Sequence, residues 1–129
     1  MPINAGDMFV VHRVFRREFR GIPALIAAVP DGDATRAKVI GDHMRFMMAA
    51  LHHHHAAEDD LVWPKLRARA PRSLGVMQRM VDEHAEFAAA VDHTETLLPA
   101  WTASADREQT QQLSAAARHL SASVDKHLD

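Results

Sequence analysis

The sequence predicts an all-α protein with the architecture of an up-down four-helix bundle, and three observations carry that prediction. Proline and glycine cut the 129-residue chain into four stretches that are otherwise rich in helix-forming residues. Within each stretch apolar residues recur at steps of three and four, the spacing of one buried helix face. The chain has five glycines and no tyrosine, whereas β-sandwiches and barrels use glycine and aromatic residues freely. We therefore expect residues 1–129 to form a single domain.

The first two helices are expected on either side of a Pro-Asp-Gly turn. Residues 7–28 form the first, in which Gly21 and Pro23 are expected to kink the helix or end it early. Asp33 is a suitable N-cap for the second helix, which is expected to continue to about Trp63. The apolar face of the first helix comprises Met8, Phe15 and Phe19. That of the second comprises Ile40, Met44, Met47, Leu51 and Val62.

The third and fourth helices fill the second half of the chain. The third is expected from Ser73 to Leu98, directly before Pro99. Asp106 with Gln109 three residues later resembles a capping box, so the fourth helix begins there and runs to the end of the chain. The apolar face of the third comprises Met77, Met80, Val81, Phe87, Val91 and Leu98. That of the fourth comprises Leu113, Ala117, Leu120 and Val124.

Composition excludes several classes of function. Fifteen lysines and arginines against 17 aspartates and glutamates give a net charge of -2 without a basic stripe, so nucleic acid is not an expected partner. The absence of cysteine excludes disulfide scaffolds, cysteine nucleophiles and thiolate-bound zinc or iron–sulfur clusters. No signal-peptide core and no apolar run of about 20 residues is present. We therefore expect a cytoplasmic protein that does not enter a membrane.

Histidine is the unusual component, with ten residues in the chain. Four of them form the run His52–His55, which at about 100° per residue points in four directions. His54 follows the apolar face of the second helix, and Glu58, four residues later, lies one turn further along that face. Each of the other helices carries one histidine in line with its apolar residues: His12, His84 and His127.

This inward set favours a metal site over an ordinary polar core. A single histidine on an apolar face is more often a hydrogen-bonded core residue, but four of them with a buried carboxylate need a cation to be stable. Nitrogen and oxygen ligands without thiolate suit iron, zinc, manganese or copper. His55 lies at the edge of the buried face, so either it or His54 is the ligand from the run. The remaining histidines are expected at the surface: His43, His52, His53, His93 and His119.

Four segments of the sequence resemble the hemerythrin-like (HHE cation-binding) family. They are residues 12–19, 51–64, 82–87 and 119–127, of which the second, with its histidine run followed by Glu58 and Pro64, is the most specific. The resemblance implies a four-helix bundle around two non-haem iron ions joined by an oxo or hydroxo bridge and a carboxylate, with zinc less favoured. Carried over residue by residue, the metal ligands are His12, His54, Glu58, His84 and His127.

Two departures from the family pattern restrict this resemblance to one subgroup of the family. Oxygen-carrying members have a second histidine four residues after the first in the third helix, but Ala88 stands four residues after His84. The sequence therefore resembles the subgroup with one histidine in that helix. Members of this subgroup have a carboxylate four residues after the last histidine. In this sequence the position four residues after His127 lies beyond Asp129, the last residue given. We expect that the C-terminal end of the fourth helix is missing from this sequence.

A centre of this kind would act on small molecules. Open positions on iron behind an apolar lining favour peroxide, nitric oxide or O2 as partners, in redox defence or sensing. The residues expected in that lining are Phe15, Met47, Leu51, Phe87 and Val124. A catalase-like or nitric-oxide-consuming activity is one interpretation, and a non-enzymatic iron or oxygen sensor or O2-binding protein is another. A third is a structural bundle that binds zinc adventitiously through His52–His55. The sequence leaves the metal, the natural oxidant and the oligomeric state open.

Overall fold

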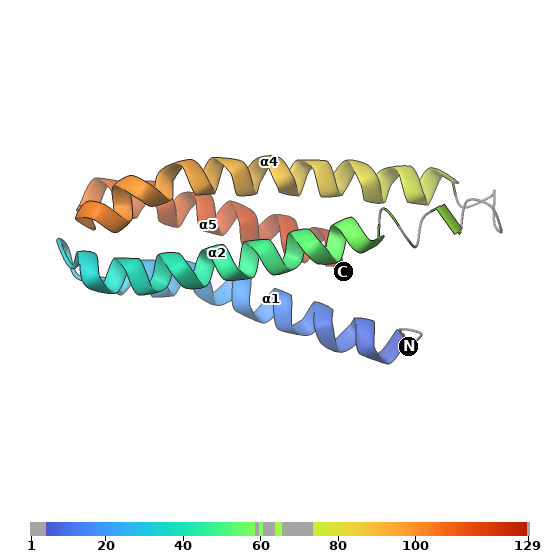
Figure 1. Cartoon of the computed structure of the whole chain (residues 1–129), viewed down its shortest axis with the longest axis horizontal. Coiled ribbons are helices and arrows are strands. Elements are labelled where there is room, and N and C mark those ends of the chain that lie inside the picture. The colour runs from blue at the N-terminus through green and yellow to red at the C-terminus, as the bar shows by residue number, and fades with distance from the viewer. Residues whose placement is uncertain (1–4, 59, 61–63, 66–73, 129) are drawn as a thin grey trace.

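The computed structural model describes residues 5–58, 60, 64–65 and 74–128, with side chains for all of these except residues 5–9, 74 and 127–128. This part of the chain forms four helices: α1 (Ala5–Ala27), α2 (Ala34–Ala57), α4 (Leu74–Ser104) and α5 (Arg107–Leu128). Successive helices run in opposite directions, and each packs against two neighbours in the circular order α1, α2, α4, α5 (Figure 1). The predicted up-down bundle is therefore confirmed. Among the described residues, no helix combines the length and apolar character needed to cross a membrane.

Both predicted N-caps are present. Asp33 accepts a hydrogen bond from the backbone N–H of Arg36 at 3.0 Å, and Asp106 accepts one from the N–H of Gln109 at 3.1 Å. Each carboxylate satisfies one of the backbone donors that a helix leaves without a partner in its first turn. The starts of α2 and α5 are thus determined by local sequence, as expected.

Two prolines lie inside helices. α1 continues through Pro23 and α4 through Pro99, so the first helix does not end early and the predicted end of the third helix at Leu98 is wrong. A proline within a helix costs about 3 kcal/mol because it removes a backbone hydrogen bond. In α4, Leu98 and Trp101 on either side of the proline are both 0% exposed. Burying side chains of that size contributes about 1.5–3 kcal/mol each, which offsets the cost.

The apolar faces predicted from the sequence form the core of the bundle. Their buried members are Phe15, Phe19, Ile40, Met44, Met47, Leu51, Met77, Phe87, Leu98, Leu113, Ala117, Leu120 and Val124. Met80, Val81 and Val91 are half-buried. Met8 and Val62 fall outside the described side chains. The helical period therefore predicted the buried face as well as the helices.

The two ends of the bundle differ. At one end the α1–α2 turn meets the α4–α5 turn, where the N–H of Gly32 donates to the carbonyl of Ala105 at 2.9 Å. Both residues have positive φ, 82° for Gly32 and 49° for Ala105, which glycine adopts without strain and alanine does not. At the opposite end, the N-terminal part of α1 runs away from α2 (Figure 1). The metal-ligand candidates lie toward this second, more open end.

Candidate metal centre

His54 and Glu58 stand one helical turn apart at the end of α2. Glu58, the residue after α2, keeps helical dihedral angles (φ -62°, ψ -47°), and its N–H donates to the carbonyls of His54 and His55. The side chains of His54 and Glu58 therefore share one face, and His54 Nε2 lies 2.6 Å from Glu58 Oε1. They are only 15% and 10% exposed. Trp63, where this helix was expected to end, falls outside the described residues.

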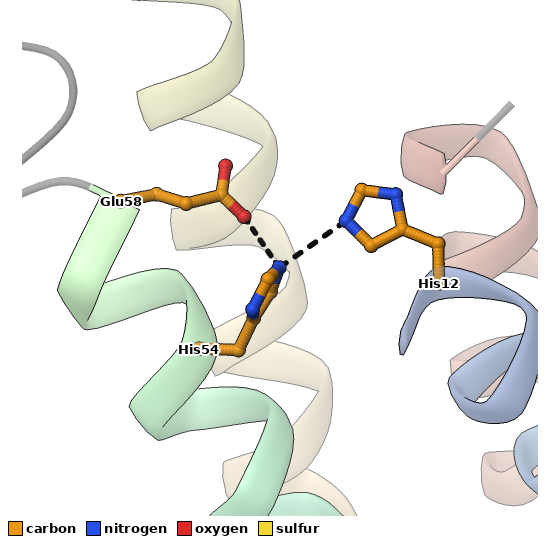
Figure 2. Close-up of side chains that lie close together, drawn as sticks. All are labelled: His12, His54 and Glu58. Carbon is orange, nitrogen blue, oxygen red and sulfur yellow. Dashed lines mark hydrogen bonds and ion pairs between the residues drawn. The ribbon is translucent and has the colours of Figure 1, made fainter. Parts of the chain in front are cut away.

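α1 brings a second imidazole to the same point. His12 Nε2 lies 3.2 Å from His54 Nε2, and the two rings meet edge to face with centroids 5.2 Å apart. Figure 2 shows both contacts converging on one nitrogen of His54, with His12 and Glu58 on either side of it. His12 comes into this position because it follows the same face of α1 as the buried Phe15 and Phe19.

These three residues fit a metal ion. One ligand atom from each of His12, His54 and Glu58 lies within 4.8 Å of the other two. First-row metals bind imidazole nitrogen and carboxylate oxygen at about 2.0–2.2 Å, so ligand atoms at right angles around one ion are about 3 Å apart. The contacts of 2.6 and 3.2 Å lie on either side of that spacing. Two imidazoles and a carboxylate also match the donor preferences of iron, manganese and zinc.

The surroundings of this group are apolar. Phe15 lies against His54, with ring centroids 5.8 Å apart. The lining that the sequence predicted is buried throughout, and it comprises Phe15, Met47, Leu51, Phe87 and Val124. Glu58 as a whole residue is 8% exposed. A carboxylate at that depth costs several kcal/mol unless a positive charge compensates it, and a cation bound by this group would supply such a charge.

A family model for the hemerythrin HHE cation binding domain matches residues 7–129. The chain belongs to the hemerythrin HHE cation-binding family. Comparison with curated proteins and with solved structures yields no match. Both the family and the group formed by His12, His54 and Glu58 indicate that the domain binds a cation.

The predicted ligands of the HHE domain fall into three groups. His12, His54 and Glu58 come together. His84 is buried, at 6% exposed, but among the described residues it is not part of that group. The side chain of His127 falls outside those that the structure describes.

His55 is the residue whose position the sequence left open, and it is buried at 6% exposed. Its ring stacks on that of His84 with centroids 3.9 Å apart and an interplanar angle of 11°. The run of histidines therefore sends two side chains inward, since His54 faces α1 and His55 faces α4. A signal existed in the sequence: Met48 and Leu51, both 1% exposed, precede His55 at seven and four residues, the spacing of a second apolar line.

Four of the other five histidines are exposed, as predicted. His52, His53, His93 and His119 are exposed. His43 is half-buried, and its Nε2 lies 3.4 Å from Glu18 Oε2.

A groove of about 720 Å³ runs between α2 and α4 beside the candidate centre. His55 and His84 form part of its wall, together with the small side chains of Ala85 and Ala88. Met48 and Phe87 give it an apolar floor. The groove therefore connects the buried histidine pair to the surface of the HHE domain.

Proposed function

We propose that this HHE domain is a non-haem di-iron protein that reacts with small oxidants, namely peroxide, nitric oxide or O2, in redox defence or sensing. The observation that carries the proposal is the convergence of His12, His54 and Glu58 from two helices within 4.8 Å. When bound there, iron supplies the redox chemistry, because it alternates between ferrous and ferric states. Glu58 with His84 and His127 are the proposed ligands of the second ion.

The protein side chains hold and shield the site. The two neutral imidazoles and the anionic carboxylate together bind the cation. This combination of nitrogen and oxygen ligands suits Fe²⁺ and Fe³⁺ better than nitrogen ligands alone. Phe15 is 8% exposed, its ring lies 5.8 Å from that of His54, and it keeps bulk water from that side of the ligand. Exclusion of water strengthens the attraction between Glu58 and the cation.

We expect the reactants at this site to be small molecules. The polar groups in contact with His54 are His12 and Glu58, which are themselves proposed ligands, and the apolar ring of Phe15 lies on another side of it, so we propose no large polar substrate for this site. Peroxide, nitric oxide and O2 need only an open position on the metal. A catalase-like or nitric-oxide-consuming reaction is therefore the activity that we propose to test first.

A non-enzymatic iron or oxygen sensor is the second candidate, and one observation favours it. His12 lies in the N-terminal half of α1 and contacts His54, near the C-terminal end of α2, at 3.2 Å. A cation shared by these two residues ties α1 to α2, and its loss releases the tie. Such a change at the open end of the bundle could be recognised by a partner protein.

Metal content after substitution tests the proposal. His12→Ala and His54→Ala are each expected to lower the iron bound after anaerobic reconstitution by at least tenfold, since each removes a ligand. His53→Ala is the matched control, because His53 is exposed in the same run, and it should retain iron. Equal losses in all three variants would favour adventitious binding to the exposed run, and the proposed centre would be abandoned.

Activity then separates the two candidates. Peroxide decay or nitric oxide consumption over many turnovers by the iron-loaded protein, lost in His54→Ala, supports the enzyme. Tight iron binding with an oxygen-dependent absorption spectrum but no turnover supports the sensor. Zinc in place of iron, with neither property, contradicts both.

A further inference from the structure

The groove between α2 and α4 is large enough to hold an organic ligand. Its volume of about 720 Å³ lies within the range of about 300–1,000 Å³ that small-molecule sites occupy. Met48 and Phe87 form its floor, and they are 1% and 4% exposed. A ligand in the groove can therefore bury its apolar part against side chains that belong to the core.

Small side chains keep this part of the α2–α4 interface open. The alanines that line the groove are Ala49 and Ala56 of α2 and Ala85 and Ala88 of α4. Because an alanine side chain ends at Cβ, neither helix fills the space between them. Further along, the same two helices are in close contact, since a Cβ on Gly41 would lie 2.7 Å from Thr102 Cγ2. The groove is thus a local widening between two helices that pack tightly elsewhere.

The fixed charges along the groove are negative. Among the residues that the structure describes, the lining contains three carboxylates, Asp60, Asp92 and Glu95, and no lysine or arginine. Asp92 and Glu95 are both exposed and stand three residues apart on α4, so they lie on the same side of that helix. These carboxylates do not belong to the described group that could hold a metal ion, which favours an organic cation as their partner.

We propose that this groove binds a small amphipathic organic cation, an amine whose apolar body lies over Met48 and Phe87. Its ammonium group meets the carboxylates of Asp92 and Glu95. Burial of the apolar body contributes affinity in proportion to its area, and carboxylates along one rim select positive over negative charge. The proposal does not depend on the proposed function, because the three residues that come together at the candidate metal centre do not line the groove.

Three ligands of similar shape and different charge test the proposal. Phenethylammonium, phenethyl alcohol and hydrocinnamate each carry a phenyl ring on a two-carbon chain, which ends in a positive, a neutral and a negative group. Each is titrated into the ¹⁵N-labelled full chain in chelator and low salt, at about pH 7.5, where the amine is charged and an ordinary imidazole is neutral. Backbone ¹H–¹⁵N NMR shifts give the Kd and the location of the site. Phenethylammonium should bind about fivefold more tightly than the alcohol, as two exposed ion pairs allow, and hydrocinnamate more weakly than either.

The double variant Asp92→Asn/Glu95→Gln tests the carboxylates. It should lower the affinity for phenethylammonium about fivefold, to that for the alcohol, and leave the affinity for the alcohol unchanged. Glu86→Gln is the matched control, because Glu86 is exposed on the same helix but does not line the groove. This control should change neither affinity.

Ala88→Leu tests the groove itself, because the larger side chain occupies part of its space. It should weaken the binding of phenethylammonium and of phenethyl alcohol alike, by about tenfold or more. Ala89→Leu is the control, since Ala89 is exposed beside Ala88 but does not line the groove. Circular dichroism and the Tm check that both variants are folded. His54→Ala, which removes a proposed metal ligand, should bind phenethylammonium as the wild type does.

The outcomes separate this proposal from the metal centre. Shifts that map to the α2–α4 groove, with these changes in affinity, support it. No saturable binding of phenethylammonium to the wild type would overturn it, as would equal affinity for the cation and the alcohol. Binding that Ala88→Leu leaves intact would place the ligand elsewhere, and binding lost in His54→Ala would assign it to the metal centre. A protein that binds no iron changes none of these expectations, so the two proposals fail separately.

Discussion

Replacing Glu58 by glutamine should have a small effect on the stability of the metal-free protein and a large effect on that of the metal-loaded protein. Glutamine keeps the length of the side chain and an oxygen that can accept from His54, now 2.6 Å from Glu58 Oε1, but it removes the negative charge. Without metal, a neutral amide is less costly to bury than a carboxylate at 8% exposure. We therefore expect the free energy of unfolding to change by less than about 1 kcal/mol in chelator.

With metal, the loss should be large. At a free Fe²⁺ concentration 100 times Kd, binding stabilises the folded state by about 2.7 kcal/mol. An unfolding entropy of about 2.1 cal/mol/K per residue gives about 0.27 kcal/mol/K for 129 residues. Metal should therefore raise the Tm of the wild type by about 10 °C. If Glu58→Gln weakens binding about 100-fold, the same Fe²⁺ contributes about 0.4 kcal/mol, and the rise falls to about 1.5 °C.

Differential scanning calorimetry under anaerobic conditions measures the Tm of the wild type and of Glu58→Gln, each with chelator and with Fe²⁺. Glu86→Gln is the control, because Glu86 is exposed on α4, and its Tm should rise with Fe²⁺ by as much as that of the wild type. If Glu58→Gln lowers the Tm equally in chelator and in Fe²⁺, the carboxylate stabilises the fold through its contact with His54 and the assignment as a metal ligand is wrong.

Two further predictions concern the packing of the helices. Asp125 in α5 accepts a hydrogen bond from Arg20 Nε of α1 at 3.0 Å. Because this ion pair is partly exposed, Asp125→Ala should lower the free energy of unfolding by less than about 1 kcal/mol. In chemical denaturation, 1 M salt should abolish that difference. A Cβ on Gly41 would lie 2.7 Å from Thr102 Cγ2, so Gly41→Ala should destabilise the α2–α4 contact by about 1–2 kcal/mol. Gly21→Ala, with nothing within 4 Å of the new Cβ, should leave the Tm unchanged or raise it; a loss as large as that of Gly41→Ala would contradict the steric explanation.

Local helix geometry made much of the site predictable. Residues four apart on a helix share a face, so His54 and Glu58 could be paired from their spacing alone, and the structure brings them into contact. His12 could be added because it follows the same period as the buried Phe15. None of these inferences needed to know how the helices are arranged around one another.

The burial of His55 and the end of α4 depend on how the helices pack against one another, so the sequence did not predict them. His55 lies at the edge of the α2 face, and only the position of α4 against that edge buries it on His84. The end of α4 depended on the same kind of information: Pro99 predicts a break, but the buried Trp101 holds the helix in place, with its Nε1 donating to Thr110 Oγ1 of α5 at 2.8 Å. Contacts between helices, which a single helix period does not contain, determine both features.

The division of the core explains why metal should add to the stability of this bundle rather than create its fold. Several side chains toward the closed end, where the two turns meet, are 0% exposed: Ile26, Leu98, Trp101, Ala105 and Leu113. Around the ligands the apolar residues are buried as well, from Leu51 at 1% exposed to Phe15 at 8%. Apolar burial thus stabilises one end without any cation, and the ligands join α1 to α2 at the other. A metal-free protein that melts about 10 °C lower but remains a helical bundle is the expected consequence.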